Sequence, residues 1–250
     1  MNKKLIAAFV LTASILGVTK VNATQTSSQY TQRYIIQDMY GAAFTANGQT
    51  EDLISSPATP YPLNKTMWIF FPQQTNRPGE WVELGGGKGV TATSITIPNP
   101  QPQEQTYWDG HYFTYQRVTA DGSRWYYEGR IGSANPTGSH RYKLERDLTQ
   151  PNRWKSSVDN VAAYFITIAG ASNYNVGKQL NIGIESQDNQ HSFTNGTSVE
   201  NIWSYPVGAS GFQNYTGTEP IARETNSYGW YSGWFYSQNG SPNIIQFLRP

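Results

Sequence analysis

The chain has no cysteine, few charged residues and no apolar run long enough to cross a membrane. Charged residues make up 14% of its 250 residues, against about 25% in an average soluble domain. Without cysteine, neither a disulfide framework nor a cysteine-ligated zinc module can form. The formal net charge of +1 provides no surface that neutralises phosphates. This excludes nucleic-acid binding as the main task.

Aromatic and turn-forming residues are what the chain has in quantity, with 8 Trp, 17 Tyr, 10 Phe, 23 Gly and 14 Pro. Disordered chains combine few aromatics with high net charge, so this composition excludes disorder. Alanine, glutamate, lysine and leucine are too scarce for a coiled coil or a long helical bundle. The composition is typical of an extracellular all-β domain.

The first residues have the features of an export signal. Lys3 and Lys4 precede an apolar stretch from Leu5 to Val18, and Val21-Asn22-Ala23 offers the small residues that a signal peptidase recognises. The apolar stretch is shorter than the ~20 residues that a membrane span needs. We therefore predict that residues 1–23 form a cleaved signal peptide and that the protein is secreted or periplasmic. The missing cysteines are compatible with bacterial export.

The rest of the chain predicts strands and turns. Short β-prone runs alternate with Gly, Pro, Asn and Ser, and nowhere do apolar residues keep a helical period over three turns. Ala120-Asp121-Gly122 is a turn signal between two such runs, which predicts a hairpin. The charged stretch from Arg141 to Asp147 is typical of a solvated strand edge. We predict one domain over residues 24–250, built as a sandwich of two packed antiparallel sheets.

Two motifs that could hold a cofactor or a metal have the wrong spacing. Gly85 to Gly89 lacks the leading Gly and the following Ser or Thr of a phosphate-binding loop, and we interpret its glycines as a tight turn with positive φ. Asp109 and His111 share one face of a strand, but no second histidine lies at a ligand spacing. A surface pair is the simpler interpretation. We therefore predict neither a cofactor nor a metal ion.

The carboxylates are the best candidates for chemistry. Strand alternation puts Trp81 with Glu83, and Asn181 with Glu185, on the polar faces of two strands whose other faces are apolar. Glu128 is a third acid beside aromatic residues. If these faces lie side by side on a concave sheet, they form a groove that suits sugar rings, because aromatics stack on sugars while carboxylates bind hydroxyls. The alternative is that the acids are solvated on an exposed face. The candidate catalytic residues are Glu83, Glu128 and Glu185, and the candidate ligand-binding residues are Trp81, Asn181, Tyr107, Trp108, Tyr112 and Tyr127.

One of these strands resembles a known motif. Trp81-Val82-Glu83-Leu84-Gly85, followed by Lys88-Gly89, is similar to the W-V-E-x-G-x-x-K-G strand of a group of secreted bacterial proteins with a concanavalin A-like jelly-roll fold. More distantly, it resembles the glutamic peptidases (eqolisins), in which a Gln and a Glu on the concave sheet activate water. The resemblance implies that Glu185 matches their catalytic Glu, or Asn181 if the register shifts by four. The chain departs from the eqolisin motif W-V-G-I-D-G, since Glu83 and Gly85 replace its Gly and Asp, and no Gln follows before Gln101.

Three functions from different classes remain open. The first is a module that binds polysaccharide or cell-surface glycan through the aromatic face. The second is an extracellular hydrolase, either a glutamic-type peptidase or a glycosidase, that acts on a glycan or protein substrate through Glu83, Glu128 or Glu185. The third is a structural or interaction protein whose aromatics fill a large sandwich.

Overall fold

The computed structural model describes residues 29–48, 50–54, 63–72, 79–92, 94–96, 105–118, 124–133, 136–169, 173–186, 191–215, 221–225, 231–236 and 242–249. These residues form strands, turns and loops, and none of them lies in a helix that could span a membrane. The strands are β1 (Gln29–Ala46), β2 (Leu53–Ile54), β3 (Leu63–Phe70), β4 (Trp81–Ala92), β5 (Ser94–Thr96), β6 (Gln105–Val118), β7 (Arg124–Ile131), β8 (His140–Arg146), β9 (Arg153–Val158), β10 (Val161–Thr167), β11 (Gly177–Ser186), β12 (Ser192–Phe193), β13 (Ser198–Pro206), β14 (Gln213–Asn214), β15 (Ile221–Thr225), β16 (Tyr231–Tyr236) and β17 (Pro242–Leu248).

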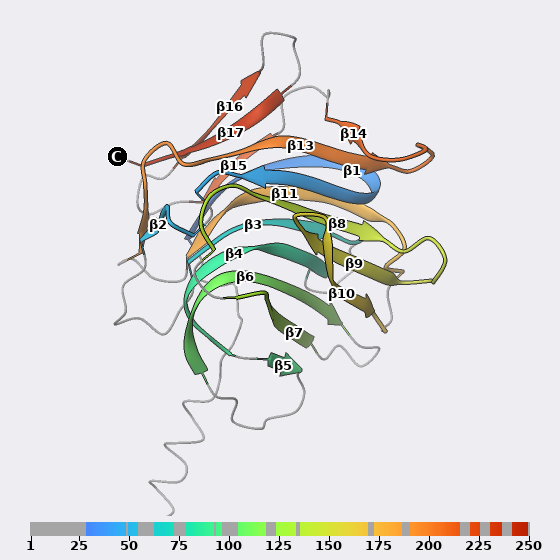
Figure 1. Cartoon of the computed structure of the whole chain (residues 1–250). Helices are drawn as coiled ribbons and strands as arrows, with labels where there is room; N and C mark the ends of the chain where they lie inside the picture. The colour runs from blue at the N-terminus through green and yellow to red at the C-terminus, as the bar shows by residue number, and fades with distance from the viewer. Residues whose placement is uncertain are drawn as a thin grey trace, which may run out of the picture.

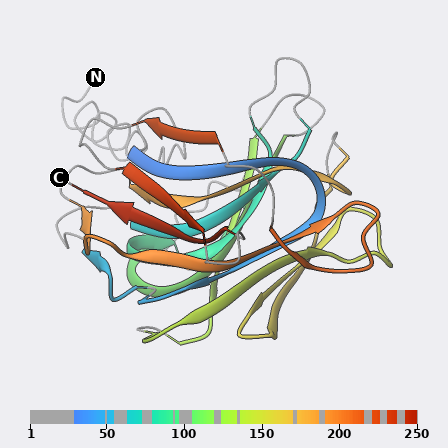
Figure 2. The same cartoon turned by 90° about the horizontal axis from the view of Figure 1, so that it is seen from above.

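Strand β1 belongs to two sheets and joins them. Its first half pairs with β11 and β15, and its second half pairs with β8 and β13. The register of β1 against β11 shifts between Ile36 and Met39, and an irregularity of this kind bends a strand and increases its twist. Figure 2 shows β1, in blue, turning back at one end of the molecule. The bend lets one strand form part of both layers.

The pairing is antiparallel throughout the described residues, and β1 joins fifteen strands into one continuous sheet that folds into two layers, which we call the first and second sheets. Strands β2 and β12 form a separate two-stranded sheet. The first sheet has the order β15-β1-β11-β3-β4-β6-β7-β5, and the second sheet has the order β10-β9-β8-β1-β13-β17-β16, with β14 also paired to β13. In Figure 1, β8, β9 and β10 lie in front of β3, β4 and β6. The predicted all-β sandwich of antiparallel sheets is confirmed.

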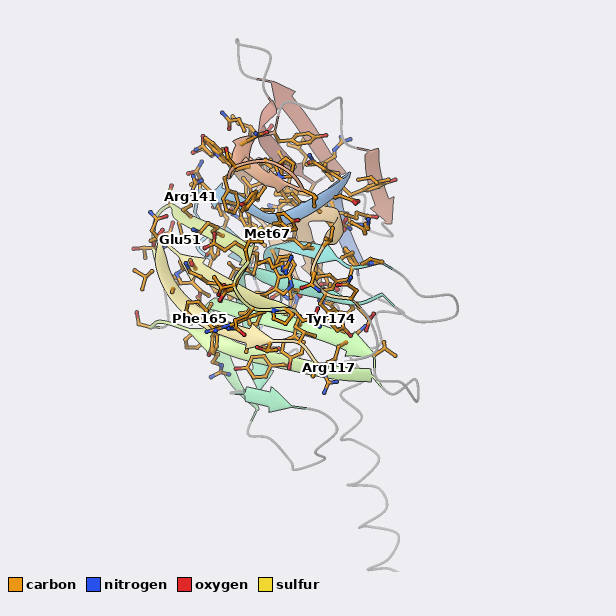
Figure 3. The ribbon with its side chains drawn as sticks, turned by 90° about the vertical axis from the view of Figure 1, so that its right-hand side faces the viewer. Glu51, Met67, Arg117, Arg141, Phe165 and Tyr174 are labelled. Atoms are coloured by element: carbon orange, nitrogen blue, oxygen red, sulfur yellow. The ribbon has the colours of Figure 1, made fainter. Side chains whose placement is uncertain are left out.

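The core lies between the two sheets and takes one side of each strand. Val82 and Leu84 of β4 are fully buried, as are alternate residues of β3, β6 and β11. Across the core, Tyr142 and Trp154 of the second sheet are also fully buried, and Met67 of β3 lies among the ribbons of the molecule in Figure 3. The opposite side of the first sheet is therefore left for polar residues.

Three local predictions have definite outcomes. The hairpin around Asp121 is confirmed, because β6 and β7 pair up to Val118 and Arg124 on either side of the turn. The prediction of a turn at residues 85–89 is wrong, because these residues lie inside β4. Among its glycines only Gly89 has a positive φ, whereas a Cβ on Gly85 would lie 2.4 Å from the carbonyl oxygen of Lys65. Gly85 is required by close approach of β3, and not by a turn.

The stretch from 141 to 147 was also predicted wrongly. It is not a sheet edge, because β8 pairs with β1 on one side and with β9 on the other. Its charges are compensated within the second sheet, since Glu145 lies 3.0 Å from Lys143 and 2.9 Å from Lys155. The predicted signal peptide, residues 1–23, lies outside the described residues, so the secreted location stays a prediction.

Candidate functional site

A row of polar and aromatic side chains crosses the first sheet on the side that faces away from the core. Asn181, Trp68, Glu83, Thr114 and Glu128 are successive partners on β11, β3, β4, β6 and β7. Residues directly opposite each other on antiparallel strands project to the same side. We call this side the site face. It brings together two of the three acids predicted from the sequence, and Glu185 lies on it by alternation along β11.

Glu83 is the centre of this face. Its carboxyl group is buried, with 4% of the residue exposed, and the hydroxyl of Tyr112 donates a hydrogen bond to its Oε1. Burial, followed by the negative charge of Glu185 and, less strongly, that of Glu128, raises the pKa of Glu83, whereas hydrogen bonds from Tyr112 and Thr66 lower it. The resulting pKa is about 8. A carboxyl with this pKa keeps its proton at neutral pH.

Tyr112 reaches Glu83 from the neighbouring strand β6, and Gly87 makes room for its ring. Tyr112 is the direct cross-strand partner of Gly85, which is two residues from Glu83 along β4. The Tyr112 ring also lies beside Gly87, where a Cβ would be 3.3 Å from the ring. Burial and the neighbouring Glu83 raise the pKa of Tyr112 well above its ordinary value. The tyrosine therefore stays protonated and remains a hydrogen-bond donor.

The predicted ligand contacts Asn181 and Trp81 are both on the site face, but neither is exposed. The Asn181 side chain donates to Gln32 at 2.9 Å and accepts from Gln179 at 2.7 Å. Trp81 is 4% exposed and packs at 45° to the ring of Phe70. Both side chains are packed against neighbouring protein groups and have little exposed surface. The expected exposed stacking platform at Trp81 is therefore not what the structure shows.

Among the other predicted contacts, Trp108 is on the site face and Tyr127 is not. Trp108 is half-buried, with the Arg130 guanidinium 4.9 Å from its ring centroid. Tyr127 pairs with Tyr115 and stacks on it, packing against the core on the other side of the sheet. Tyr127 is next to Glu128 in the sequence, and neighbours in a strand point to opposite faces. The side chain of Tyr107 lies outside the described part of the structure.

Three further residues belong to the site face and were not predicted from the sequence, namely Thr66, Trp68 and Thr114. Thr66 and Trp68 alternate along β3 with fully buried Met67 and Ile69, so the same alternation that selected Glu83 could have found them. Thr114 has no comparable signal in its own strand. It becomes part of the site because β6 lies between β4 and β7.

The histidines lie elsewhere. His111 and Asp109 alternate with the site-face residues of β6, and both are buried, so the predicted surface pair is wrong. The Tyr142 hydroxyl is 2.7 Å from Nδ1 of His111, and Lys88 is 3.0 Å from Asp109. Burial, aided by the charge of His140, lowers the pKa of His111 to about 4. No three His, Asp or Glu side chains within the described ranges are grouped to hold a metal ion.

The fold and the site define a class: an antiparallel β-sandwich with a buried, proton-holding carboxyl on the outer side of one sheet. No family model and no curated protein matches the chain. The fold is similar to that of SCP-B, a member of the eqolisin family of peptidases solved with the tripeptide Ala-Ile-His, with 11% identity over 89% of this chain and 98% of that chain and a TM-score of 0.48.

Two further solved structures are similar at the same level of fold. Scytalido-glutamic peptidase, solved with a peptide-based transition-state analogue, has 11% identity over 89% of this chain and 98% of that chain, with a TM-score of 0.48. A glycoside hydrolase family 16 endo-glucanase from Bacteroides ovatus has 10% identity over 70% of this chain and 77% of that chain, with a TM-score of 0.35. The similar structures thus include peptidases and glycosidases, and the likeness concerns the fold alone.

Proposed function

We propose that the site face binds a polysaccharide or cell-surface glycan and hydrolyses it by acid–base catalysis, with Glu83 as the proton donor. The observation that supports this most directly is the environment of Glu83. A carboxyl that is buried, hydrogen-bonded by Tyr112 and surrounded by the charges of Glu185 and Glu128 keeps a proton near neutral pH. A protonated acid beside carboxylates is the arrangement that glycoside hydrolysis requires.

The proposed reaction uses two carboxyl groups in different protonation states. Glu83 gives its proton to the oxygen of the leaving sugar, because its pKa lies above that of an ordinary carboxyl. A second carboxylate, Glu128 or Glu185, supports the attack on the anomeric carbon. The negative charge of a nearby carboxylate favours the protonated form of Glu83, so one carboxyl group is protonated while the other is ionised.

A glycan fits the rest of the face. The row from Asn181 to Glu128 crosses five strands, which is roughly 19 Å at the usual spacing of strands. Its carboxyl groups are acceptors for the hydroxyl groups of a sugar, and Trp68 lies among them. An extended ligand with many hydroxyls would use the whole row, whereas a small apolar ligand would use little of it.

A screen for turnover tests the proposal. We expect the wild-type chain to release new reducing ends from at least one polysaccharide in a panel of β-glucan, xylan, chitosan and pectin, measured between about pH 4 and pH 8. Casein is included in the same assay. Cleavage of casein alone would replace the glycan with a peptide substrate, and no turnover of any substrate would contradict the proposal.

A second candidate function is glycan binding without cleavage, and the pair of Trp108 and Arg130 favours it. Both are half-buried on the site face, where the guanidinium can donate several hydrogen bonds. Trp108→Ala removes the aromatic support of Arg130, so we expect about fivefold weaker retention in affinity electrophoresis through polysaccharide gels, in line with about 1 kcal/mol for an aromatic contact. Tyr127→Phe, on the other face, is the control. Equal retention of both variants would contradict a binding role for Trp108.

A further inference from the structure

Thr114 occupies an unusual place between two acids. It is fully buried, and its direct partners in the row are Glu83 on β4 and Glu128 on β7. Its hydroxyl Oγ1 has no hydrogen-bond partner among the described residues. A buried hydroxyl without a partner is unfavourable by about 1–3 kcal/mol. A bound water that accepts or donates a hydrogen bond at Oγ1 would remove this cost.

A second unsatisfied donor lies close by in the sheet. The indole Nε1 of Trp81 is buried and also lacks a partner within the described residues. Trp81 is two residues from Glu83 on β4, so it shares the site face, and it is diagonal to Thr114 across the pairing of β4 with β6. Two orphaned groups and two carboxyls therefore belong to one small area. A buried water typically makes about three hydrogen bonds, and this area offers enough partners for one.

The other side of Glu83 offers no such position. Thr66 of β3 lies on that side, in the direction of Glu185, but its hydroxyl already has partners, namely the carbonyl oxygen of Leu84 at 3.0 Å and the carboxyl group of Glu83. Glu185 is also displaced from the row that contains Glu83. The β11 residue in that row is Asn181, and Glu185 lies four residues further along the strand. The side with an unsatisfied hydroxyl is therefore the side of Glu128.

The strand order also sets the distance between the two acids. Glu83 and Glu128 are two strands apart in one row, which puts their Cα atoms about 10 Å apart at the usual strand spacing, with both side chains on the same face. Inverting glycosidases hold their carboxyl groups about 6.5–9.5 Å apart to leave room for a water, whereas retaining enzymes need about 5–5.5 Å. A Cα separation of two strands, with both side chains on one face, leaves room for a water between the two carboxyl groups, which favours the first class.

We propose that Thr114 positions the attacking water between Glu83 and Glu128, and that hydrolysis proceeds with inversion at the anomeric carbon. This inference rests on the proposed glycoside hydrolysis. The water passes one proton to the Glu128 carboxylate while its oxygen forms a bond to the anomeric carbon. The bond from that carbon to the leaving oxygen breaks on the opposite face, and Glu83 gives its proton to the leaving oxygen. Thr114 is a positioning residue, since it acts through the water.

A crystal structure of the ligand-free protein tests the water directly and needs no substrate. At a resolution of about 1.5 Å we expect an ordered water within hydrogen-bond distance of both Thr114 Oγ1 and a carboxyl oxygen of Glu128. The same crystals of Thr114→Val should lack this water while the strands keep their places. A wild-type structure with no water at Thr114 would overturn the inference and leave the proposed hydrolysis standing.

Kinetics on a polysaccharide that the wild type cleaves test the role of the water. Thr114→Val conserves shape, so we expect kcat to fall on the order of 10²-fold because the nucleophile is misplaced, with KM unchanged. Thr114→Ser restores the hydroxyl and should recover most of the rate. ¹H NMR of the first products should show the inverted anomer. Full activity of Thr114→Val or a retained anomer would overturn the inference, whereas inactivity of the wild type on all substrates would overturn the proposed function with it.

Discussion

Glu83→Gln is expected to lower kcat for polysaccharide hydrolysis by about 10²- to 10⁴-fold, the range for loss of a general acid. The amide keeps the shape of the side chain and can still accept the hydrogen bond from Tyr112, but it has no acidic proton to give to the leaving sugar. KM should change little, because the substrate contacts remain. The measurement is the initial rate of reducing-end release by the wild type and the variant.

The hydrolysis rate of the wild type should also depend on pH. A proton donor works in its protonated form, so the rate should fall as the pH rises through the pKa of Glu83, which burial raises to about 8. Glu83→Gln should lose this alkaline limb together with its rate. Glu51→Gln, a substitution of an exposed acid away from the site face, is the matched control and should behave as the wild type. A Glu83→Gln variant with wild-type kcat would exclude Glu83 as the proton donor.

Lys65→Met is expected to have the largest effect on stability, lowering the free energy of unfolding by about 3 kcal/mol. Lys65 has no exposed surface. Its Nζ donates to the carbonyl oxygens of Asn47 and Gly48 at 3.0 and 3.2 Å and to Thr197 Oγ1 at 2.6 Å, and it lies 3.5 Å from Asp52. Methionine fills the volume but leaves these acceptors without their donor.

The hydrogen bonds of Lys65 attach β3 to neighbouring segments, so the stability that they provide also supports the site face. Lys65 lies next to Thr66 of the site face, on the strand that separates β11 from β4. Urea unfolding of Lys65→Met and Lys143→Met measures the difference. Lys143 is partly exposed and pairs with Glu145 at 3.0 Å, so its loss should change the free energy of unfolding by less than about 1 kcal/mol. Equal stability of the two variants would show that the buried contacts of Lys65 contribute nothing.

The layered fold was predictable from local pattern, whereas the connection between its layers was not. Alternation in β4 and β11 marks Val82, Leu84 and Ile182 as core residues, and all three are buried. The bend that lets β1 join both sheets depends on a register shift after Ile36. Such a shift is decided by pairing with strands that are distant in sequence, so no short window of residues contains it.

The site was predictable in part for the same reason. Glu83 and Glu128 carry a local signal, since each acid alternates with apolar or aromatic neighbours. The position of the two acids relative to each other has no local signal, because only the strand order β4-β6-β7 places Thr114 between them. Tyr127 shows the converse, since alternation alone separates it from Glu128, and adjacency in the sequence was the wrong guide. The burial of Trp81 also depends on packing that its own strand does not encode.

The most direct test of the central claim is the titration of the Glu83 side chain. The carboxyl carbon can be followed by ¹³C NMR in protein labelled at glutamate, with the Glu83 signal assigned by its absence from Glu83→Gln. A midpoint near pH 8 is the predicted result, because burial and the charges of Glu185 and Glu128 favour the protonated form. A midpoint near the ordinary value of about 4.3 would mean that Glu83 carries no proton at neutral pH, and would contradict its role as the acid.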